Sequence, residues 1–484
     1  MSNLKIFVPP APNAAVSGIL GTRGMEIVDV HGNKVVLKGA GLGGHLNMEN
    51  FITGYAGHEQ GMRRAVQKVL GEHKSNYFFH KLLEYFFDDL DAEFYASLGF
   101  NCLRIPFNYR HFEDDMNPGT YDERGFLWLD RIINICARHG IYTVLDMHTV
   151  PGAQNQNWHS DNPTNTALFW EHIDFQNRAI RLWEALAARY KGNTWVAGYN
   201  PLNEPGDEYH YRLLNWYERV EKAIRGVDPD HILFLDGNTV GVELFKSPLP
   251  NSVYAIHDYS IYGFPGSEPY SGSERQLQHL WDQYDHKVEY HGKANVPIWN
   301  GEFGPVYSSP RDGDNWQETN LQRYHLLKDQ LSIYAQEGIS WSIWLYKDIG
   351  LQGMVYVSPE SPYLKRFGEF IARKRRLAAD EWGADVTAVE SVFEPLIAWF
   401  NEQVPNFNKY PSAWGTKKHC AFTLRLERVT RHILLSDSLC GEYAELFRGL
   451  TMEELDALAA SFKYENCVQR QELNQILKAN SGKE

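Results

Sequence analysis

The stretch that decides the fold is Tyr199-Asn200-Pro201-Leu202-Asn203-Glu204-Pro205-Gly206-Asp207, which follows the short apolar run Trp195-Val196-Ala197-Gly198. Such a run is typical of a buried strand, so Glu204 is expected just beyond a strand end. A second stretch, Val296-Pro297-Ile298-Trp299-Asn300-Gly301-Glu302-Phe303-Gly304, repeats the layout and places Glu302 at another strand end. Two glutamates at the C-terminal ends of two strands match the needs of a glycosidase, in which one protonates the leaving oxygen and the other attacks the anomeric carbon.

Short apolar runs of this kind recur along the chain and alternate with helical patterns. The first follows a predicted β-hairpin of Met25–Asp29 with Val35–Leu37 and continues into the glycine-rich Gly39–Gly44. The other seven are Cys102–Ile105, Tyr142–Met147, Trp195–Tyr199, Ile232–Leu235, Val253–His257, Pro297–Trp299 and Ser340–Leu345. Helix-like segments separate most of them, at Leu83–Ser97, Gly125–Arg138, Leu168–Tyr190, Tyr209–Gly226, Glu274–Tyr290 and Trp316–Gln336. Eight strands alternating with helices predict an α/β fold, the closed parallel (β/α)8 TIM barrel.

Some segments lie outside this repeat. Asn50–Lys81 is a polar, helix-prone insertion after the first strand, on the face where the βα loops build active sites, so it is predicted to form one wall of the cleft. A further amphipathic helix runs from Val386 to Phe400, and the tail from His419 carries a capping-box start at Thr451–Glu454. We therefore expect an N-terminal extension at 1–24, a catalytic barrel at 25–403 and a helical C-terminal extension at 404–484.

The composition of the chain limits the classes of molecule that it is expected to bind and indicates its cellular location. The 61 acidic and 47 basic side chains give a formal charge of −14, which argues against nucleic acid and anionic membranes and suits a neutral carbohydrate or glycoside substrate. Met1–Gly24 lacks the apolar run of a signal peptide, and nothing approaches the ~20 apolar residues of a membrane span. Five cysteines without CxxC spacing favour free thiols and a cytoplasmic location. The sequence leaves the oligomeric state open.

Other polar residues also fall at or near strand ends, and each has a plainer explanation. Glu204 could sit in the first turn of a helix capped by Asn203, although the matching Glu302 favours catalysis. A buried Arg104 needs an anionic partner, which is either a carboxylate nucleophile or a structural ion pair. Asp146-Met147-His148 could begin a metal site, but no second histidine-rich cluster completes a ligand set, so we predict no metal and no cofactor. Four further strand-end residues either line a sugar site or pack in the core: His148, His257, Tyr259 and Trp344.

Taken together, the motifs between Lys38 and Lys347 resemble glycoside hydrolase family 5, and within it most resemble the fungal exo-β-1,3-glucanase and β-glucosidase group. That group's glycine-rich first strand and the segment after it match Gly41-Leu-Gly-Gly-His45-Leu-Asn-Met-Glu49-Asn50-Phe-Ile-Thr53, with His45 and Asn50 as departures. A second motif matches Asp146-Met-His148-Thr-Val-Pro151-Gly152-Ala-Gln154-Asn155; an altered loop, 156–160, then precedes Asp161-Asn162.

The resemblance implies that Glu204 is the acid/base, Glu302 the nucleophile and Asn203 the partner of the sugar 2-hydroxyl. It further implies a first sugar subsite lined by Arg104, His148, His257, Tyr259 and Trp344, and a grip on the terminal sugar by Glu49 and Asp161. We expect a retaining β-glycosidase, exo-acting on β-glucosides, in which Glu204 starts protonated with a raised pKa and Glu302 stays ionised. The alternatives are an endo-β-glucanase, a glycosidase that releases a sugar or disaccharide from a small or lipid aglycone, and a sugar-binding barrel without turnover.

Overall fold

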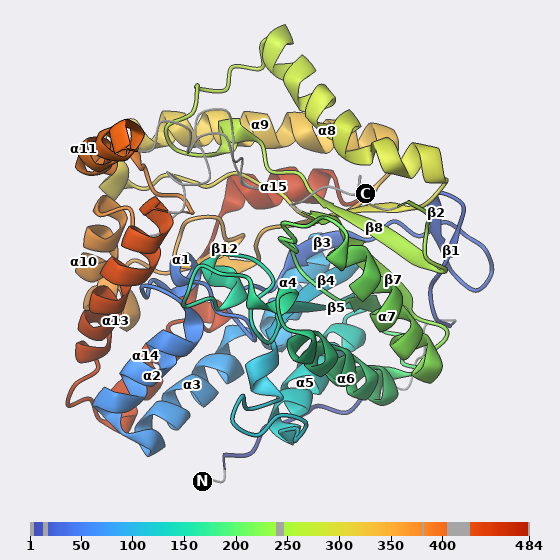
Figure 1. The fold of residues 1–484 in the computed structure, drawn as a ribbon, viewed down its shortest axis with the longest axis horizontal. Coiled ribbons are helices and arrows are strands. Elements are labelled where there is room, and N and C mark those ends of the chain that lie inside the picture. Colours follow the sequence, from blue (N-terminus) through green and yellow to red (C-terminus); the bar gives the residue numbers. More distant parts are fainter. Residues whose placement is uncertain (1–3, 13–17, 239–245, 380–381, 404–425, 483–484) are drawn as a thin grey trace.

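Eight parallel strands close into a barrel in the order β10-β3-β4-β5-β6-β7-β8-β9. The structure, a computed structural model, describes residues 4–12, 18–238, 246–379, 382–403 and 426–482. Figure 1 shows the barrel strands at the centre of a ring of helices. This arrangement confirms the predicted (β/α)8 barrel. The strands are β3 (Lys38–Gly41), β4 (Cys102–Asn108), β5 (Tyr142–Thr149), β6 (Val196–Asn200), β7 (Ile232–Asp236), β8 (Ser252–His257), β9 (Ile298–Glu302) and β10 (Ser340–Ile343).

The outer helices largely follow the predicted segments: α5 (Glu123–Arg138), α6 (Ile173–Tyr190), α7 (Arg212–Val227), α8 (Glu274–Ala294), α9 (Trp316–Glu337), α10 (Pro362–Arg376) and α11 (Thr387–Gln403). The single helix predicted at Leu83–Ser97 is wrong. The chain instead ends α3 (Glu72–Phe86) and restarts as α4 (Asp89–Ser97). Asp88 causes the break, because its side chain accepts from the backbone amides of Leu90 and Asp91 and caps a new helix.

The N-terminal hairpin also differs from the prediction. β1 (Gly21–Arg23) pairs with β2 (Glu26–Val28), and Gly24 supplies the left-handed φ of 56° that the tight turn needs. The predicted second arm is present only at its start. Val28 forms an antiparallel bridge with Lys34, and the amide of Val35 donates to the carbonyl of Ile27 at 2.8 Å before the chain enters β3.

The insertion after the first barrel strand and the tail of the chain pack together. The insertion forms α1 (Asn50–Thr53), α2 (Glu59–Leu70) and α3, and the tail forms a π-helix (Val429–Leu435), α13 (Ser436–Glu445), α14 (Met452–Ala460) and α15 (Gln471–Ala479). α13 lies on α2, α14 on α3 and α15 on α9 (Figure 1). Aromatic contacts such as Phe78–Phe447 and Phe86–Phe462 make this contact region part of the same hydrophobic core as the barrel.

The predicted helical tail is thus present, with an addition that the sequence pattern did not show. A short strand, β13 (Cys467–Gln469), pairs antiparallel with β12 (Val355–Val357), which runs parallel to β11 (Lys347–Asp348). The predicted boundary between residues 403 and 404 borders 404–425, which lie outside the described residues. That boundary stays a prediction.

A buried lysine connects the end of the barrel to both sets of helices. Lys347 has no exposed surface; its ammonium donates to the carbonyls of Phe86 and Phe462, at 2.8 Å each, and pairs with Asp91 at 2.6 Å. Burial raises the pKa of Asp91 to about 6, although Lys347 works in the opposite direction. The ammonium group of Lys347, which lies on β11, therefore contacts α3, α4 and the segment after α14.

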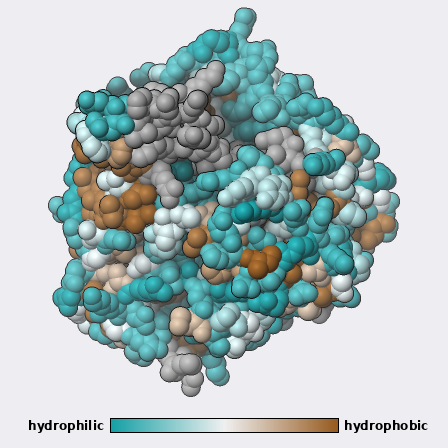
Figure 2. Space-filling view, in the orientation of Figure 1, coloured by the Kyte–Doolittle hydropathy of each residue, from teal (hydrophilic) through white to brown (hydrophobic). Residues whose placement is uncertain are grey.

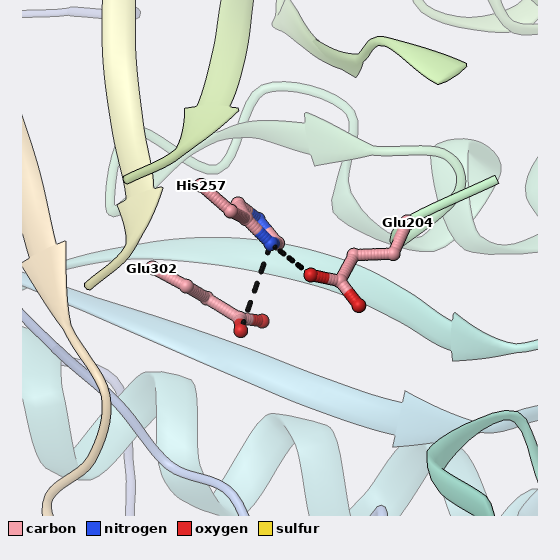
Figure 3. A group of neighbouring side chains, drawn as sticks. All are labelled: Glu204, His257 and Glu302. Carbon is pink, nitrogen blue, oxygen red and sulfur yellow. Dashed lines mark hydrogen bonds and ion pairs between the residues drawn. The ribbon is translucent and has the colours of Figure 1, made fainter. Parts of the chain in front are cut away.

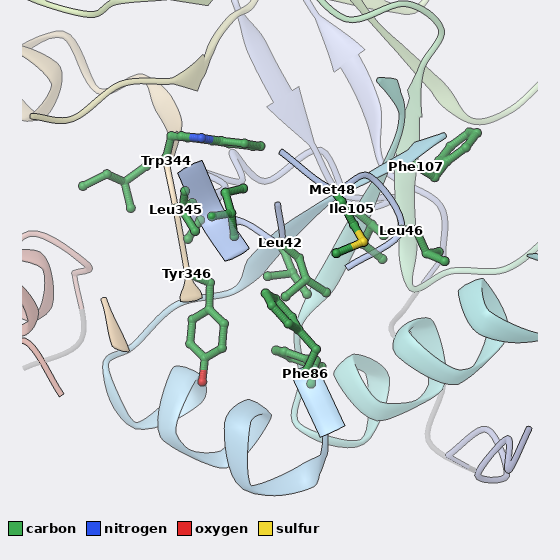
Figure 4. Packing of buried hydrophobic residues seen from close by; sticks show 14 of the residues in the cluster. Leu42, Leu46, Met48, Phe86, Ile105, Phe107, Trp344, Leu345 and Tyr346 are labelled. Carbon is green, nitrogen blue, oxygen red and sulfur yellow. The ribbon is translucent and has the colours of Figure 1, made fainter. Parts of the chain in front are cut away.

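Apolar side chains of the loop after β3 pack together with Phe86, Ile105 and Trp344 (Figure 4). Leu42, Leu46 and Phe86 are fully buried. A Cβ atom at Gly41 or Gly43 would come within 2.6 Å of the Trp344 ring. The close approach of this indole therefore explains the glycines at positions 41 and 43.

The described surface is mostly hydrophilic, with an apolar area on the side where α10, α11 and α13 lie (Figure 2). α11 exposes Val392, Leu396 and Trp399. Within the described ranges, no helix combines the length and apolar character needed to cross a bilayer. Cys102, Cys136, Cys440 and Cys467 are free thiols, as expected, and Cys420 lies outside the described residues.

The Lys347 cross-link generates a stability prediction. Lys347→Ala should lower the free energy of unfolding by about 3–5 kcal/mol, because it leaves the Asp91 carboxylate buried without its cation. Urea denaturation followed by tryptophan fluorescence measures this change. Arg448→Ala is the control, since its partner Glu445 is on the surface, and it should leave the transition unchanged. Equal transitions for the two variants would contradict the structural role of Lys347.

Candidate active site

The two glutamates lie at or just beyond the C-terminal ends of β6 and β9, which β7 and β8 separate in the barrel, and both carboxylates approach His257 (Figure 3). Glu302 is the last residue of β9, and Glu204 follows β6. One carboxylate oxygen of each lies within 4.8 Å of the other and of a ring nitrogen of His257. Glu204 has a φ of 41°, a left-handed conformation that is unfavourable for a side chain of this size and is characteristic of functional positions. Its amide donates to Asp236 at 3.0 Å and its carbonyl accepts from Asn155 at 2.9 Å, which holds this conformation.

Arg104 on β4 is the fully buried cation of the site. Its guanidinium bonds Glu302 at 2.5 Å and Asn203 at 2.7 Å, and it pairs with Asp146 at 3.0 Å. Burial would lower the pKa of Arg104, but the carboxylates of Asp146 and Glu302 raise it. The arginine therefore keeps its charge and places a cation against the Glu302 carboxylate. Tyr259 adds a second donor to the same carboxylate, at 2.9 Å.

A chain of hydrogen bonds orients the polar groups beside Arg104. Because Asn203 accepts from Arg104 through its side-chain oxygen, its nitrogen donates to Nε2 of His148, at 3.2 Å. Nδ1 of His148 then donates to Asp146 at 2.7 Å, which fixes the tautomer of the ring. Trp344 stacks on the His148 ring with centroids 5.6 Å apart and an interplanar angle of 5°.

His257 lies between the two glutamates. Its Nδ1 is 2.7 Å from Oε1 of Glu204 and 3.6 Å from Oε2 of Glu302. Burial alone would lower the pKa of His257, but Glu302, Glu204 and Asp236 raise it to about 9. Burial would likewise raise the pKa of Glu204, but the hydrogen bond and charge of His257 lower it to about 2. The expectation of a raised Glu204 pKa is therefore wrong for the free protein, because His257 competes for the proton.

Glu49 lies close enough to the two glutamates for their charges to act on it. It is 4% exposed, accepts from the indole of Trp158 at 3.3 Å and lies 3.9 Å from His148. Burial raises its pKa, and the charges of Glu302 and Glu204 raise it further. A buried carboxylate with a single hydrogen-bond donor has acceptor capacity left for a ligand hydroxyl.

Asp161 lies apart from this group and is already saturated. One carboxylate oxygen accepts from His58 and from the amide of Gln60, and the other accepts from Asn108 and Arg110, at distances between 2.8 and 3.1 Å. It borders a polar cavity of about 400 Å³ whose lining includes Glu59 and Arg63 and does not include Glu49, Glu204 or Glu302. The structure thus brings nine of the ten predicted residues together and separates Asp161 from them; its sugar contact stays a prediction.

The structure adds four buried residues that the sequence reasoning did not single out: Asn155, His159, Asn200 and Asp236. Asn200 accepts from Arg104 at 3.1 Å, and Asp236 holds the Glu204 amide. Both end barrel strands, so the strand-end rule that pointed to Glu302 could have found them. His159 and Asn155 contact Glu204 from a loop whose conformation the sequence pattern does not predict.

Among the described residues, one group could bring three ligand atoms to a metal ion: Glu204, His257 and Glu302. These atoms already bond one another, Arg104 and Tyr259, and two cationic groups balance the carboxylates. We therefore describe the group as a proton-transfer cluster rather than as a metal centre.

Comparison with known proteins agrees with this geometry. Residues 87–350 match the model of the cellulase family, glycosyl hydrolase family 5. A β-xylosidase of Phanerodontia chrysosporium is 54% identical over 472 residues, covering 96% of this chain and 98% of that protein. "Probable glucan 1,3-beta-glucosidase A" of Aspergillus clavatus is 28% identical over 66% of this chain and 84% of its own length.

Among solved structures, an endogalactoceramidase aligns with a TM-score of 0.50 and 18% identity over 68% of this chain and 75% of its own, a likeness of fold. The family match covers more than half of the chain, and the β-xylosidase aligns along nearly its whole length. The residues that form the cluster around Arg104 and the two glutamates fall within or next to the matched range. The chain belongs to glycoside hydrolase family 5 and is a β-glycosidase.

Proposed function

We propose that this β-glycosidase is retaining and exo-acting, and that it removes one terminal sugar by double displacement with Glu302 as nucleophile and Glu204 as acid/base. The observation that carries the proposal is the approach of the two carboxylates, whose oxygens come within 4.8 Å of each other. Retaining glycosidases hold the two groups about 5–5.5 Å apart, whereas inverting ones need about 6.5–9.5 Å for the attacking water.

In the proposed first step, a Glu302 oxygen attacks the anomeric carbon, the glycosidic C–O bond breaks, and Glu204 gives its proton to the leaving oxygen. In the second step, Glu204 takes a proton from water as the water oxygen attacks the same carbon and Glu302 leaves. Arg104 and Tyr259, both bonded to Glu302, supply the charge and the donor that keep the nucleophile ionised between turnovers.

The surroundings of Glu49 support a pocket closed at one end. Trp158 bonds Glu49, and the His432 ring of the C-terminal π-helix packs edge-on against Trp158 at 5.5 Å. Trp382, which follows α10, packs against Tyr259 at 4.8 Å and against Phe51 of the insertion at 6.1 Å. The insertion and the C-terminal part of the chain thus build walls around the catalytic carboxylates, which favours release of a single sugar.

We infer β-xylosides as the preferred substrate class, because the relative that aligns along 98% of its length is named a β-xylosidase. β-Glucosides are the second candidate, supported by the matched motifs and by the glucan 1,3-β-glucosidase relative. The two sugars differ by one hydroxymethyl group on C5. Parallel kcat/KM values for aryl β-xyloside and aryl β-glucoside decide between them.

The nucleophile assignment predicts a chemical rescue. Glu302→Gln should lower kcat by a factor on the order of 10³ or more, because an amide cannot attack the anomeric carbon. Glu302→Gly with added azide should recover turnover and give the glycosyl azide of inverted configuration, which NMR identifies. Glu289→Gln, on the exposed face of α8, is the control and should keep full activity. An active Glu302→Gln enzyme would refute the assignment.

The closed pocket predicts the order in which products appear. An oligosaccharide substrate should yield monosaccharide from the first time points, and a chain blocked at its non-reducing end should be inert. Glu49→Ala should cost at least about tenfold in kcat/KM, because a charge-assisted hydrogen bond is worth roughly 1.5–3 kcal/mol. Exposed Glu72→Ala serves as the control. A ladder of mixed oligomers in the time course would support an endo-acting groove instead.

Asp161 should matter for stability rather than for sugar binding. Burial would raise the pKa of Asp161, but His58 and Arg110 lower it to about 2, below its unfolded value of 3.8. The folded state therefore gains stability above pH 3.8 that is lost as the pH falls toward 2, an effect of about 2 kcal/mol. Asp161→Asn should lower the free energy of unfolding at pH 7 by this amount, less at pH 3, with KM unchanged. A tenfold rise in KM without a stability change would contradict this role.

A further inference from the structure

The orientation of the Asn155 side chain is fixed by two backbone groups. Its Oδ1 accepts from the amide of Asn157 at 2.9 Å, and its Nδ2 donates to the carbonyl of Glu204, also at 2.9 Å. A rotated amide would place nitrogen against a donor and oxygen against an acceptor, so the observed orientation is the one that satisfies both partners. Asn155 has no exposed surface.

This orientation determines the tautomer of His159. Nδ2 of Asn155 lies 2.9 Å from Nε2 of His159. Because an amide nitrogen only donates, Nε2 must accept, and the ring proton belongs on Nδ1. Burial lowers the pKa of His159 to about 4, although Glu204 raises it, so the ring is uncharged near neutral pH.

The same Nε2 lies 3.2 Å from Oε2 of Glu204. An ionised Oε2 would face the lone pair of the imidazole, which is repulsive, whereas a protonated Oε2 would donate a hydrogen bond to it and share this lone pair with Nδ2 of Asn155. The other oxygen, Oε1, meets the opposite condition, because His257 donates to it at 2.7 Å. The remaining titratable groups around this carboxylate are Glu302, His148, Asp236 and Glu49.

We propose that His159 is a positioning residue whose Nε2 accepts from Oε2 of Glu204 when the catalytic proton moves there from His257, with Asn155 setting the tautomer that makes this possible. The proposal rests on the proposed acid role of Glu204. His257 holds the proton in the free protein, and a protonated Oε2 finds an acceptor in Nε2 of His159, so the acid form of Glu204 is more favourable than it would be beside His257 alone. When the glycosidic bond breaks, this proton passes to the leaving oxygen, and Oε2 becomes the base that receives a proton from water. His159 belongs to the altered loop 156–160, so the device is a feature of this loop.

The test compares pH profiles on two substrates, an alkyl β-glycoside that needs protonation on departure and an aryl β-glycoside with an acidic leaving group. In His159→Phe, the alkaline limb of the kcat/KM profile on the alkyl substrate should move about one pH unit toward lower pH. At pH values above the limb, kcat/KM should then fall about tenfold. The aryl substrate should be nearly spared. Asn155→Asp should move the limb in the same direction, because a carboxylate there accepts from Nε2 and places the ring proton on it.

Gln156→Ala is the matched control, since this residue lies in the same loop and its side chain bonds Glu208; its limb should not move. An unmoved limb in His159→Phe, or equal losses on both substrates, would overturn the proposal. Neutron diffraction of the wild-type protein tests it without a variant: a deuteron on Nδ1 of His159 is expected, and one on Nε2 overturns it. Glu204→Ala separates the two claims. If Glu204→Ala loses activity equally on both substrates, the acid role of Glu204 is refuted. If Glu204→Ala keeps activity on the aryl substrate while His159→Phe leaves the alkaline limb unmoved, only the inference on His159 is refuted.

Discussion

The structure of this site depends on the requirement that a buried guanidinium be fully paired. Arg104 has no exposed surface, so each of its donors needs an acceptor inside the barrel. The acceptors come from three other strands or strand ends: Asp146 on β5, Asn200 and Asn203 at the end of β6, and Glu302 on β9. One cation thereby aligns the C-terminal ends of four strands. Its positive charge also balances the negative charge of Glu302. In such a buried site, the protonation of the nearby carboxylates depends strongly on the residues that bond each of them.

Differences between these residues separate the chemistry of the two glutamates. Glu302 is bound by two donors, the permanent cation of Arg104 and the phenol of Tyr259. Glu204 is bound by groups that themselves titrate or change tautomer, so its proton can leave and return within a cycle. The strained backbone of Glu204, held by Asp236 and Asn155, aims the carboxylate between the two imidazoles. The two carboxylates share one low-dielectric site, so their different roles come from the residues that bond each of them and not from the distance between them.

Much of this could be predicted from sequence, because strand ends in a parallel barrel converge on one face. Glu204, Glu302 and Arg104 follow from that rule, and so do His148 and Trp344. Asp161 shows the limit of a motif match, which does not predict side-chain partners: its carboxylate accepts from Arg110 and His58, and its contact with a sugar stays a prediction. His159 could not be predicted, because its role depends on which atom of Asn155 faces it. The helix break at Asp88 was not predicted because it depends on local capping by that side chain. The strand β13 was not predicted because it depends on pairing with β12, which is far away in the chain.

The packing of the tail on the insertion has a consequence for how the chain is made. Contacts such as the hydrogen bond from Tyr77 to Asp456 join residues 379 positions apart, so α2 and α3 leave the ribosome long before their partners exist. Until translation ends, the surfaces of these two helices that α13 and α14 cover lack that cover, and exposed apolar surfaces promote aggregation. The eight strands can associate earlier, but the wall beside Trp158 is completed only when the last helices arrive. A premature stop codon that removes α13 and α14 would therefore yield a barrel with exposed apolar surfaces on α2 and α3 that is prone to aggregate, instead of a shorter working enzyme.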